Sequence, residues 1–276
     1  MAAAICVAMT GAAQAEVIAH WTFDEFEDGT VAGPLVRIRD YSGNQRDGWS
    51  LGDTAMVRVT NPYGTSTAMS LGPTADGLIF RAPWSSLVFG SPAITAEQAI
   101  NWNGSWTVEI VLATTQSGER GTLMHYNAGD PDDAEWWVRM NDNGTVTFLV
   151  QDTAGTTTSV VSTIAINDGA WRHVAAIYDA VNQQIELFID GQSQGTASTA
   201  TFNGELLTDH IDYLRVGSWL NANQIQLTAL VDQVRISDEA LSPGQFIAPE
   251  PASVVLLAVG GLTLLRRRDD SARPPI

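Results

Sequence analysis

Short runs in which polar and apolar residues alternate recur along the chain, and they constrain its fold more than any other sequence feature. Residues 105–112, 171–178 and 184–189 show this alternation most clearly. A period of two is that of a β-strand with one buried face. Helix signals are nearly absent, since only residues 242–246 and 96–100 could form a turn of helix. We therefore expect an all-β chain.

Turn dipeptides separate several of these runs. Asn143-Gly144 lies between runs 135–140 and 145–150, and Asp190-Gly191 follows run 184–189. Residues of these types supply the positive φ that a tight hairpin turn requires, so each dipeptide predicts a hairpin. Many short antiparallel strands with such turns are typical of a β-sandwich. No internal repeat or linker divides the body, which predicts one domain.

Several motifs, in chain order, resemble those of bacterial LamG domains, which are laminin G-like and concanavalin A-like. The resemblance covers residues 17–247 and implies a jelly-roll sandwich of two antiparallel sheets, each with about six or seven strands. The first and last strands of such sandwiches usually pair. The motifs are residues 20–25 (HWTFDE), 40–44 (DYSGN), 47–48 (DG), 106–109 (WTVE), 168–175 (DGAWRHVA), 187–191 (LFIDG), 215–217 (RVG) and 230–242 (LVDQVRISDEALS).

The resemblance also implies a structural calcium ion at the rim of the sandwich. Calcium takes six to eight oxygen ligands from carboxylates, amides and carbonyls. Pairing of the first and last strands could bring four such residues together, namely Asp24, Asp40, Asn44 and Asp232. The alternative is that these side chains only cap their own turns by hydrogen bonding. The acidic loop 130–133 is a second candidate, whose alternative is a solvated hairpin tip.

The chain has nine tryptophans, and exposed aromatic rings are what a sugar ring stacks on. The resemblance places Trp21, Trp106 and Trp171 in the core. Trp136 and Trp137 are adjacent in one strand, so they point to opposite faces and one lies outside the core. The alternative role for these rings is to cover hydrophobic surface. The ligand-binding residues that we predict are Trp136, Trp137, Arg139 and Trp219.

Catalytic patterns are missing. Concanavalin-like glucanases carry Glu-x-Asp-x-x-Glu on one strand, and the nearest run here, residues 186–190, has no third carboxylate. The four histidines show no metal-ligand spacing, and His173 is expected to be a structural residue. The sequence predicts a non-enzymatic binding or adhesion protein whose partner is a polysaccharide or glycoprotein. The alternatives are a structural matrix component without a discrete ligand, and an unusual glycosidase.

Charge excludes one class of partner. The chain has 14 basic residues, all of them arginine, against 31 acidic ones, for a formal net charge of −17. Such a negative surface repels the phosphate backbone of nucleic acid, so we exclude nucleic acid as a partner. The one cysteine, Cys6, lies near the N-terminus, so the body has no disulfide.

Both ends of the chain differ from the body. Residues 1–15 are small and apolar and end in Ala13-Gln14-Ala15, a pattern that signal peptidase cleaves, so we expect a signal peptide. No basic residue precedes the apolar run, and the alternative is a disordered or buried N-terminus. The mature domain would then span residues 16–248.

The C-terminal segment 249–276 resembles a PEP-CTERM sorting signal. Pro249-Glu250-Pro251 is followed by an uncharged apolar run, 252–265, and by three arginines, 266–268. The positive-inside rule keeps those arginines cytoplasmic, so this segment is expected to be a short transmembrane helix. The resemblance implies processing by an exosortase-type enzyme, transient anchoring in the inner membrane, and display at the cell envelope or in extracellular polymer. The alternative is a plain, permanent anchor.

Overall fold

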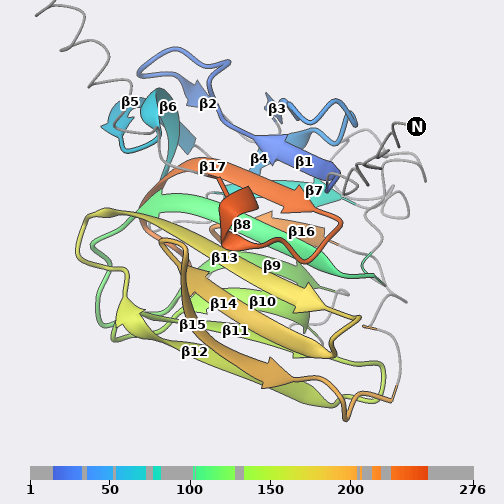
Figure 1. Ribbon diagram of the computed structural model, residues 1–276. Coiled ribbons are helices and arrows are strands. Elements are labelled where there is room, and N and C mark those ends of the chain that lie inside the picture. The colour runs from blue at the N-terminus through green and yellow to red at the C-terminus, as the bar shows by residue number, and fades with distance from the viewer. Residues whose placement is uncertain are drawn as a thin grey trace, which may run out of the picture.

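Two antiparallel β-sheets lie face to face in the computed structural model of the protein (Figure 1). All strand pairs in the part of the chain that the structure describes are antiparallel, and a single 3-10 turn, η2 (Pro243–Gln245), is the one helical element there. The expected all-β sandwich is confirmed, and so is the turn expected at 242–246. The described residues are 15–32, 36–51, 54–72, 77–81, 102, 104–127, 134–203, 206, 213–218 and 225–247.

One sheet has nine strands. Eight of them form a continuous path, and the ninth, β1, pairs beside β6 along the same edge of β17. In order across the sheet the path is β15 (Gln192–Ser198), β14 (Gln184–Ile189), β13 (Trp171–Asp179), β8 (Trp106–Ala113), β17 (Ala229–Ser237), β6 (Gly64–Leu71), β5 (Thr54–Asn61) and β2 (Val31–Ala32), with β1 at Val17–Trp21.

The other sheet has eight strands in one path. Their order is β12 (Thr157–Ala165), β11 (Thr145–Gln151), β10 (Ala134–Met140), β9 (Gly121–Asn127), β16 (Tyr213–Val216), β7 (Gly77–Arg81), β4 (Gly48–Leu51) and β3 (Arg37–Ile38).

Strand number differs from the expectation of six or seven per sheet. The additional strands lie mostly in the N-terminal third, where β2, β3 and β4 have between two and four residues each. Strands this short show no sequence period. The predicted pairing of the first and last strands is confirmed, because β1 runs beside β17 with Trp21 opposite Val234.

Both predicted hairpins form, and their turns follow the expected chemistry. In the β10–β11 turn the Asn141 amide donates to the Thr145 carbonyl at 2.7 Å, and Gly144 has φ of +83°. In the β14–β15 turn Asp190 and Gly191 both have positive φ, +52° and +73°, which is the signature of a two-residue type I′ turn.

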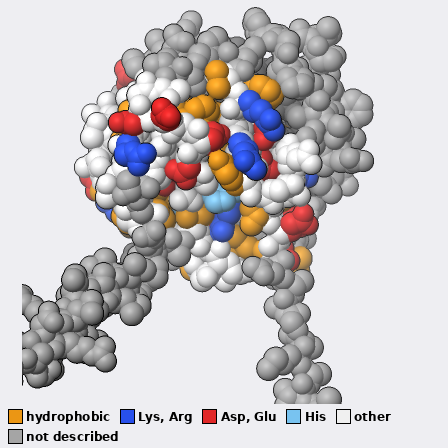
Figure 2. All heavy atoms as spheres, turned by 90° about the horizontal axis from the view of Figure 1, so that it is seen from above, with side chains coloured by type: hydrophobic (Ala, Val, Ile, Leu, Met, Phe, Trp, Pro, Cys, Tyr) orange, Lys and Arg blue, Asp and Glu red, His pale blue; other side chains and the backbone are white. Residues whose placement is uncertain are grey.

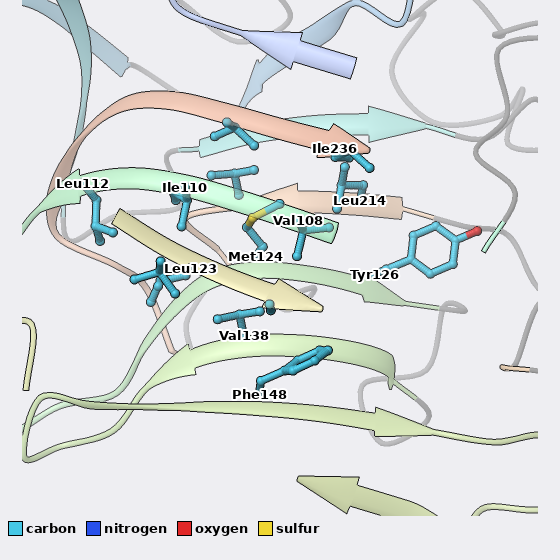
Figure 3. Packing of buried hydrophobic residues seen from close by; sticks show 14 of the residues in the cluster. Val108, Ile110, Leu112, Leu123, Met124, Tyr126, Val138, Phe148, Leu214 and Ile236 are labelled. Atoms are coloured by element: carbon cyan, nitrogen blue, oxygen red, sulfur yellow. The ribbon is translucent and has the colours of Figure 1, made fainter. Parts of the chain in front are cut away.

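The core fills the space between the sheets, where labelled side chains from β8, β9, β10 and β11 point toward one another (Figure 3). Trp106 and Trp136 are fully buried, with ring centroids 5.1 Å apart, and Trp102 packs edge-on against both. The core positions expected for Trp21 and Trp106 are confirmed. Trp171 is a correction: it is only half-buried and lies on the outer side of the nine-stranded sheet, because Val174 of the same strand points inward.

Segments 1–14 and 248–276, which carry the expected signal peptide and C-terminal helix, lie outside the described residues. Loop 130–133 and helix candidate 96–100 lie outside them too. Among the residues that are described, none belongs to a helix with the length and apolar character needed to cross a membrane.

Candidate functional site

Trp137 and Arg139 lie on the face of the eight-stranded sheet that points away from the core. Their strand neighbours Trp136, Val138 and Met140 are at most 1% exposed and belong to the core, so alternation turns Trp137 and Arg139 outward. Both outward side chains are half-buried. The guanidinium carbon of Arg139 lies 4.1 Å from the ring centroid of Trp137, a cation–π contact.

The register of the sheet places these two residues in an ordered outer surface. Trp137 has Leu149 of β11 on one side and His125 of β9 on the other, and His125 is in turn opposite Arg215 of β16. The series continues through β7 to β4, and we call it the outer row. The described side chains in this row are those of Trp49, Arg215, His125, Trp137 and Leu149.

Positive charge surrounds His125 in the outer row. His125 is fully buried, and burial, together with the charges of Arg215 and Arg139, lowers its pKa to about 3. Burial and the nearby Arg120 lower the pKa of Arg139 to about 10. At neutral pH the imidazole is therefore uncharged while the guanidinium groups keep their charge.

The predicted ligand-binding set is thus only partly brought together. Trp137 and Arg139 are in contact on the outer surface. Trp136 is a correction: it is fully buried against Trp102 and Trp106, so no ligand reaches it. Trp219 lies outside the described residues. Arg215 and His125 were not predicted, because only the register of the strands shows that they share a face with Trp137.

Two members of the predicted calcium set, Asp40 and Asn44, belong to one hydrogen-bonded turn. The Asp40 carboxylate accepts from four donors: the amides of His20, Ser42 and Arg46 and the hydroxyl of Ser42, all at 2.8–2.9 Å. Asn44 donates from its side-chain amide to backbone carbonyls of β1. Both residues tie the turn to the first strand, which is the alternative role considered for them.

The other two members, Asp24 and Asp232, lie elsewhere. Asp24 accepts from the Thr67 amide at 3.0 Å, and Asp232 accepts from the hydroxyl of Ser66. Burial raises the pKa of Asp232, and the charge of Asp24 raises it further, so these two carboxylates interact. The structure does not gather the four predicted ligands into one group. Over the residues it describes, no cluster of three or more His, Cys, Asp or Glu side chains could hold a metal ion.

A buried charged cluster on the nine-stranded sheet was missed by sequence reasoning. Glu109 of β8 is fully buried, with His173 Nε2 at 3.0 Å, Arg235 Nε at 2.6 Å and the Ile247 amide at 2.7 Å from its carboxylate oxygens. Burial raises the pKa of Glu109, but hydrogen bonds from His173 and Arg235 outweigh it and leave the pKa below its usual value. The expected structural role of His173 fits this geometry. Three strands contribute the cluster, so no sequence spacing showed it.

A pocket of about 390 Å³ lies beside this cluster, with aromatic walls that include Tyr63, Trp171 and Phe246. Its polar groups are engaged with one another. His173 bonds to Glu109, and Asp190 accepts from the His173 amide and from a guanidinium nitrogen, each at 2.9 Å. Burial raises the pKa of Tyr63, and acidic neighbours raise it further. The pocket offers apolar contact but few polar groups that are not already bonded.

The carboxylates of run 186–190 have structural partners. Glu186 accepts from the hydroxyl of Ser193 at 2.5 Å. Asp190 lies in the hairpin turn and pairs with Arg172 at 2.9 Å.

Comparison with known proteins identifies the family to which the fold belongs. The profile of a family described as the concanavalin A-like lectin/glucanases superfamily matches residues 90–245. A search of curated proteins gave no match.

Several solved structures share the fold at low sequence identity. The binding domain of Paraclostridial Mosquitocidal Protein 1 superposes with a TM-score of 0.56 and 16% identity, over 78% of this chain and 50% of that one. The binding domain of botulinum neurotoxin DC, in complex with SialylT, has a TM-score of 0.59 and 9% identity over 83% and 50%. The chain thus spans about half the length of these proteins.

A third structure matches along almost all of its length. Domain 4 of an extracellular arabinanase from Geobacillus stearothermophilus, in complex with arabinotriose, has a TM-score of 0.55 and 18% identity. The superposition covers 84% of this chain and 96% of that domain.

Proposed function

Because the chain belongs to the concanavalin A-like lectin/glucanases superfamily, we propose that it is an exported, non-catalytic protein that binds glycans through the outer surface of its eight-stranded sheet. The ligand is a polysaccharide or the glycan of a glycoprotein. The similar structures support this class of role, since two of them are binding domains and two are complexes with SialylT or arabinotriose.

The contact between Trp137 and Arg139 carries the proposal. A half-buried indole on a sheet face, with a guanidinium stacked against it, offers a flat surface of the kind on which the apolar face of a sugar ring packs. The sheet holds both side chains on one strand, so the platform is rigid before ligand binds, which lowers the entropic cost of binding.

A pull-down on insoluble polysaccharides tests this role. The Trp137→Ala variant is expected to lose binding by at least about tenfold, because stacked aromatic residues are typical hot spots. Trp171→Ala is the matched control, since Trp171 is also a half-buried tryptophan but lies on the opposite sheet. Loss of binding in the control alone would move the site to the pocket beside His173.

The two alternatives give different results in the same assay. A structural matrix component without a ligand would bind none of the polymers, with or without Trp137. A glycosidase would release reducing ends from one of them over time. Incubation of each polymer with the purified protein, followed by a reducing-end assay, separates these outcomes from simple binding.

We also propose a bound calcium ion, but with fewer ligands than the four residues predicted from the sequence. Asp40 and Asn44 are committed to their turn, so Asp24 and Asp232 are the two that could take part. A divalent cation there would relieve the repulsion between the two carboxylates. Calorimetric titration of EDTA-treated protein with calcium tests this. Heat of binding that the Asp232→Asn variant lacks supports a calcium site at these carboxylates, and absence of heat in the wild type excludes it.

Export and temporary anchoring are also part of the proposal, and they rest on residues 1–15 and 249–276. Replacement of Pro249-Glu250-Pro251 by three alanines is expected to keep the protein in the inner-membrane fraction if an exosortase-type enzyme processes the tail. Release of the variant at the wild-type level would instead exclude processing at this motif.

A further inference from the structure

The pocket beside the buried charged cluster is formed by three segments that are distant in sequence. Tyr63 comes from the turn between β5 and β6, Trp171 begins β13, and Phe246 follows β17. The segment after β17 folds back over the outside of the nine-stranded sheet to reach this place (Figure 1). The pocket volume of about 390 Å³ is within the range of small-molecule sites, about 300–1,000 Å³, so a whole small molecule fits in it.

The fold holds the aromatic walls of the pocket in place. Phe246 is 7% exposed, and its ring centroid lies 5.5 Å from that of His173. Tyr63 belongs to a tight turn, in which its own amide donates to the Asn61 side chain at 2.7 Å. Tyr63 and Trp171 are half-buried and line the pocket, so part of each ring faces it. Aromatic faces carry a negative electrostatic potential, which attracts cations.

The polar groups around the pocket already have partners. His173 is hydrogen-bonded through Nε2 to Glu109. Asp190 accepts from the His173 amide and from the guanidinium of Arg172. A ligand with many hydroxyl or N–H groups would leave several of them unpaired here, and that weakens binding. The pocket therefore favours a ligand that needs no directed hydrogen bonds.

Negative charge prevails around the pocket. Asp190 lines it, and Glu109 lies directly behind the wall formed by His173. Burial raises the pKa of Tyr63, and three acidic side chains raise it further, namely Asp190, Asp232 and Glu109. A field that opposes a negative charge on the Tyr63 hydroxyl favours a positive charge beside it.

Two arginines reduce this negative charge without cancelling it. Arg172 pairs with both Asp168 and Asp190, and Arg235 pairs with Glu109. The three acids that act on Tyr63 and Asp168 thus outnumber the two guanidinium groups. The net charge of −17 adds a long-range attraction for cations. Elsewhere the signs are mixed: acidic and basic side chains are interspersed on the side seen from above Figure 1 (Figure 2).

A quaternary ammonium ion has the chemistry that these walls and charges suit. Its positive charge is spread over methyl or methylene groups, so it has no N–H group that needs an acceptor. Those groups pack against aromatic rings, and the cation–π attraction is strongest where the cation is removed from water. A primary ammonium ion would lose its hydrogen bonds to water in the same pocket.

We propose that this pocket binds a small, soluble quaternary ammonium compound, whose methyl groups contact Tyr63, Trp171 and Phe246. The carboxylates around the pocket balance its charge, and they would repel a phosphate joined to it, which favours a free cation over a lipid head group. The site is independent of the proposed glycan site, because the pocket lies on the nine-stranded sheet and the outer row lies on the eight-stranded one.

Calorimetric titration of the purified full-length chain tests the need for positive charge. The probes are choline and its neutral carbon analogue, in which a carbon atom replaces the nitrogen. Choline is expected to bind about tenfold or more tightly than the analogue, as a desolvated cation–π contact provides. Equal affinities, or no binding of choline, overturn the proposal. Phosphocholine is expected to bind more weakly than choline, and tighter binding of phosphocholine overturns the free cation as ligand.

Aromatic variants locate the binding. Tyr63→Leu and Trp171→Leu each keep an apolar wall but remove its aromatic face, so each is expected to weaken choline binding about fivefold or more. Tyr63→Phe keeps the ring and is expected to retain the affinity. Tyr41→Leu is the matched control, because Tyr41 is 41% exposed, lies under the guanidinium of Arg39 and does not line the pocket. Unchanged choline affinity in both leucine variants of the pocket overturns the proposed site.

An acidic variant tests the role of the local charge. Asp190→Asn is expected to weaken choline binding about threefold or more and to leave binding of the neutral analogue unchanged. Asp142→Asn is the matched control, since Asp142 is also an exposed aspartate paired with an arginine, Arg120, and its loss changes net charge equally. An equal loss in the two variants overturns the proposal, because only the overall charge of the protein would then attract the cation.

Discussion

At the scale of single residues, burial of His125 makes the stability of the protein depend on pH. Its pKa of about 3 lies below the unfolded value near 6.5, so the unfolded chain binds the extra proton between these two values. The contribution of the neutral, buried imidazole to the free energy of unfolding is fully present above pH 6.5, and it is lost as the pH falls from 6.5 toward 3. From pH 7 to pH 5 the expected loss from this one residue is about 2 kcal/mol.

Urea unfolding of His125→Gln at pH 7 and pH 5 checks this expectation. The variant removes the titrating group, so the difference in unfolding free energy between the two pH values should shrink by about 2 kcal/mol. His20 contributes in the same direction, because burial lowers its pKa as well. Glu109 acts in a separate window, below its usual pKa, and does not interfere at pH 5. An unchanged pH dependence in His125→Gln would contradict the burial of the imidazole.

At the scale of elements, the β10–β11 turn depends on one glycine. A Cβ on Gly144 would lie 2.1 Å from the side-chain oxygen of Asn167, and the φ of +83° disfavours any other residue. Asn167 donates to the Gln116 carbonyl at 3.1 Å, so a displaced Asn167 also loses that bond.

Gly144→Ala is therefore expected to destabilise the protein more than Gly191→Ala, measured by guanidinium unfolding. Gly191 has a similar φ of +73° but no atom within 4 Å of a Cβ, so its variant shows the cost of φ alone, about 1 kcal/mol. Gly144→Ala adds the clash, for a total of about 2 kcal/mol or more. Equal losses in the two variants would show that Asn167 moves aside freely.

The elements that sequence could predict were those with a local signal. Hairpin turns follow from Asn-Gly and Asp-Gly, and long strands follow from alternation, so β8, β10, β11, β13 and β14 were all expected. Strands β2, β3 and β4 are too short for a period, and they were missed.

The site was predicted less well, because its residues come together through register. Alternation separated Trp136 from Trp137 correctly, but it did not tell which of the two faced the core. Arg215 and His125 joined the site through pairing of β16 with β9. Asp40 and Asn44 looked like metal ligands because Asx turns use the same side chains.

At the scale of the whole molecule, the segment after β17 covers the outside of the nine-stranded sheet. Phe246 packs on Phe188 and His173, and a second apolar cluster with Ala175 and Ile177 forms beneath it. Backbone groups of the segment also bond to the buried charges, since the Gln245 carbonyl accepts from Arg235.

Truncation measures the contribution of this segment. A chain that ends at Ile247 is expected to unfold like the longer protein, whereas one that ends at Ser242 loses about 3–5 kcal/mol of unfolding free energy. The loss follows from exposure of the surface that Phe246 and Ile247 bury, at 7% and 8% exposed, and from the hydrogen bond that Glu109 loses. Guanidinium unfolding of both truncated chains provides the comparison. Equal stability of the two would show that the segment does not hold the cluster together.

The central place of β17 also governs the timing of folding. This strand pairs with β8 on one side and with β1 and β6 on the other, so Val17 finds its partner Ser237 only after more than two hundred residues. Contacts this distant in sequence close slowly. As the chain leaves the ribosome, β6 and β8 stay as open edges that invite wrong pairing until residues 229–237 arrive. Because β17 follows every other strand of the described fold, the nine-stranded sheet cannot be completed until residues 229–237 have been synthesised.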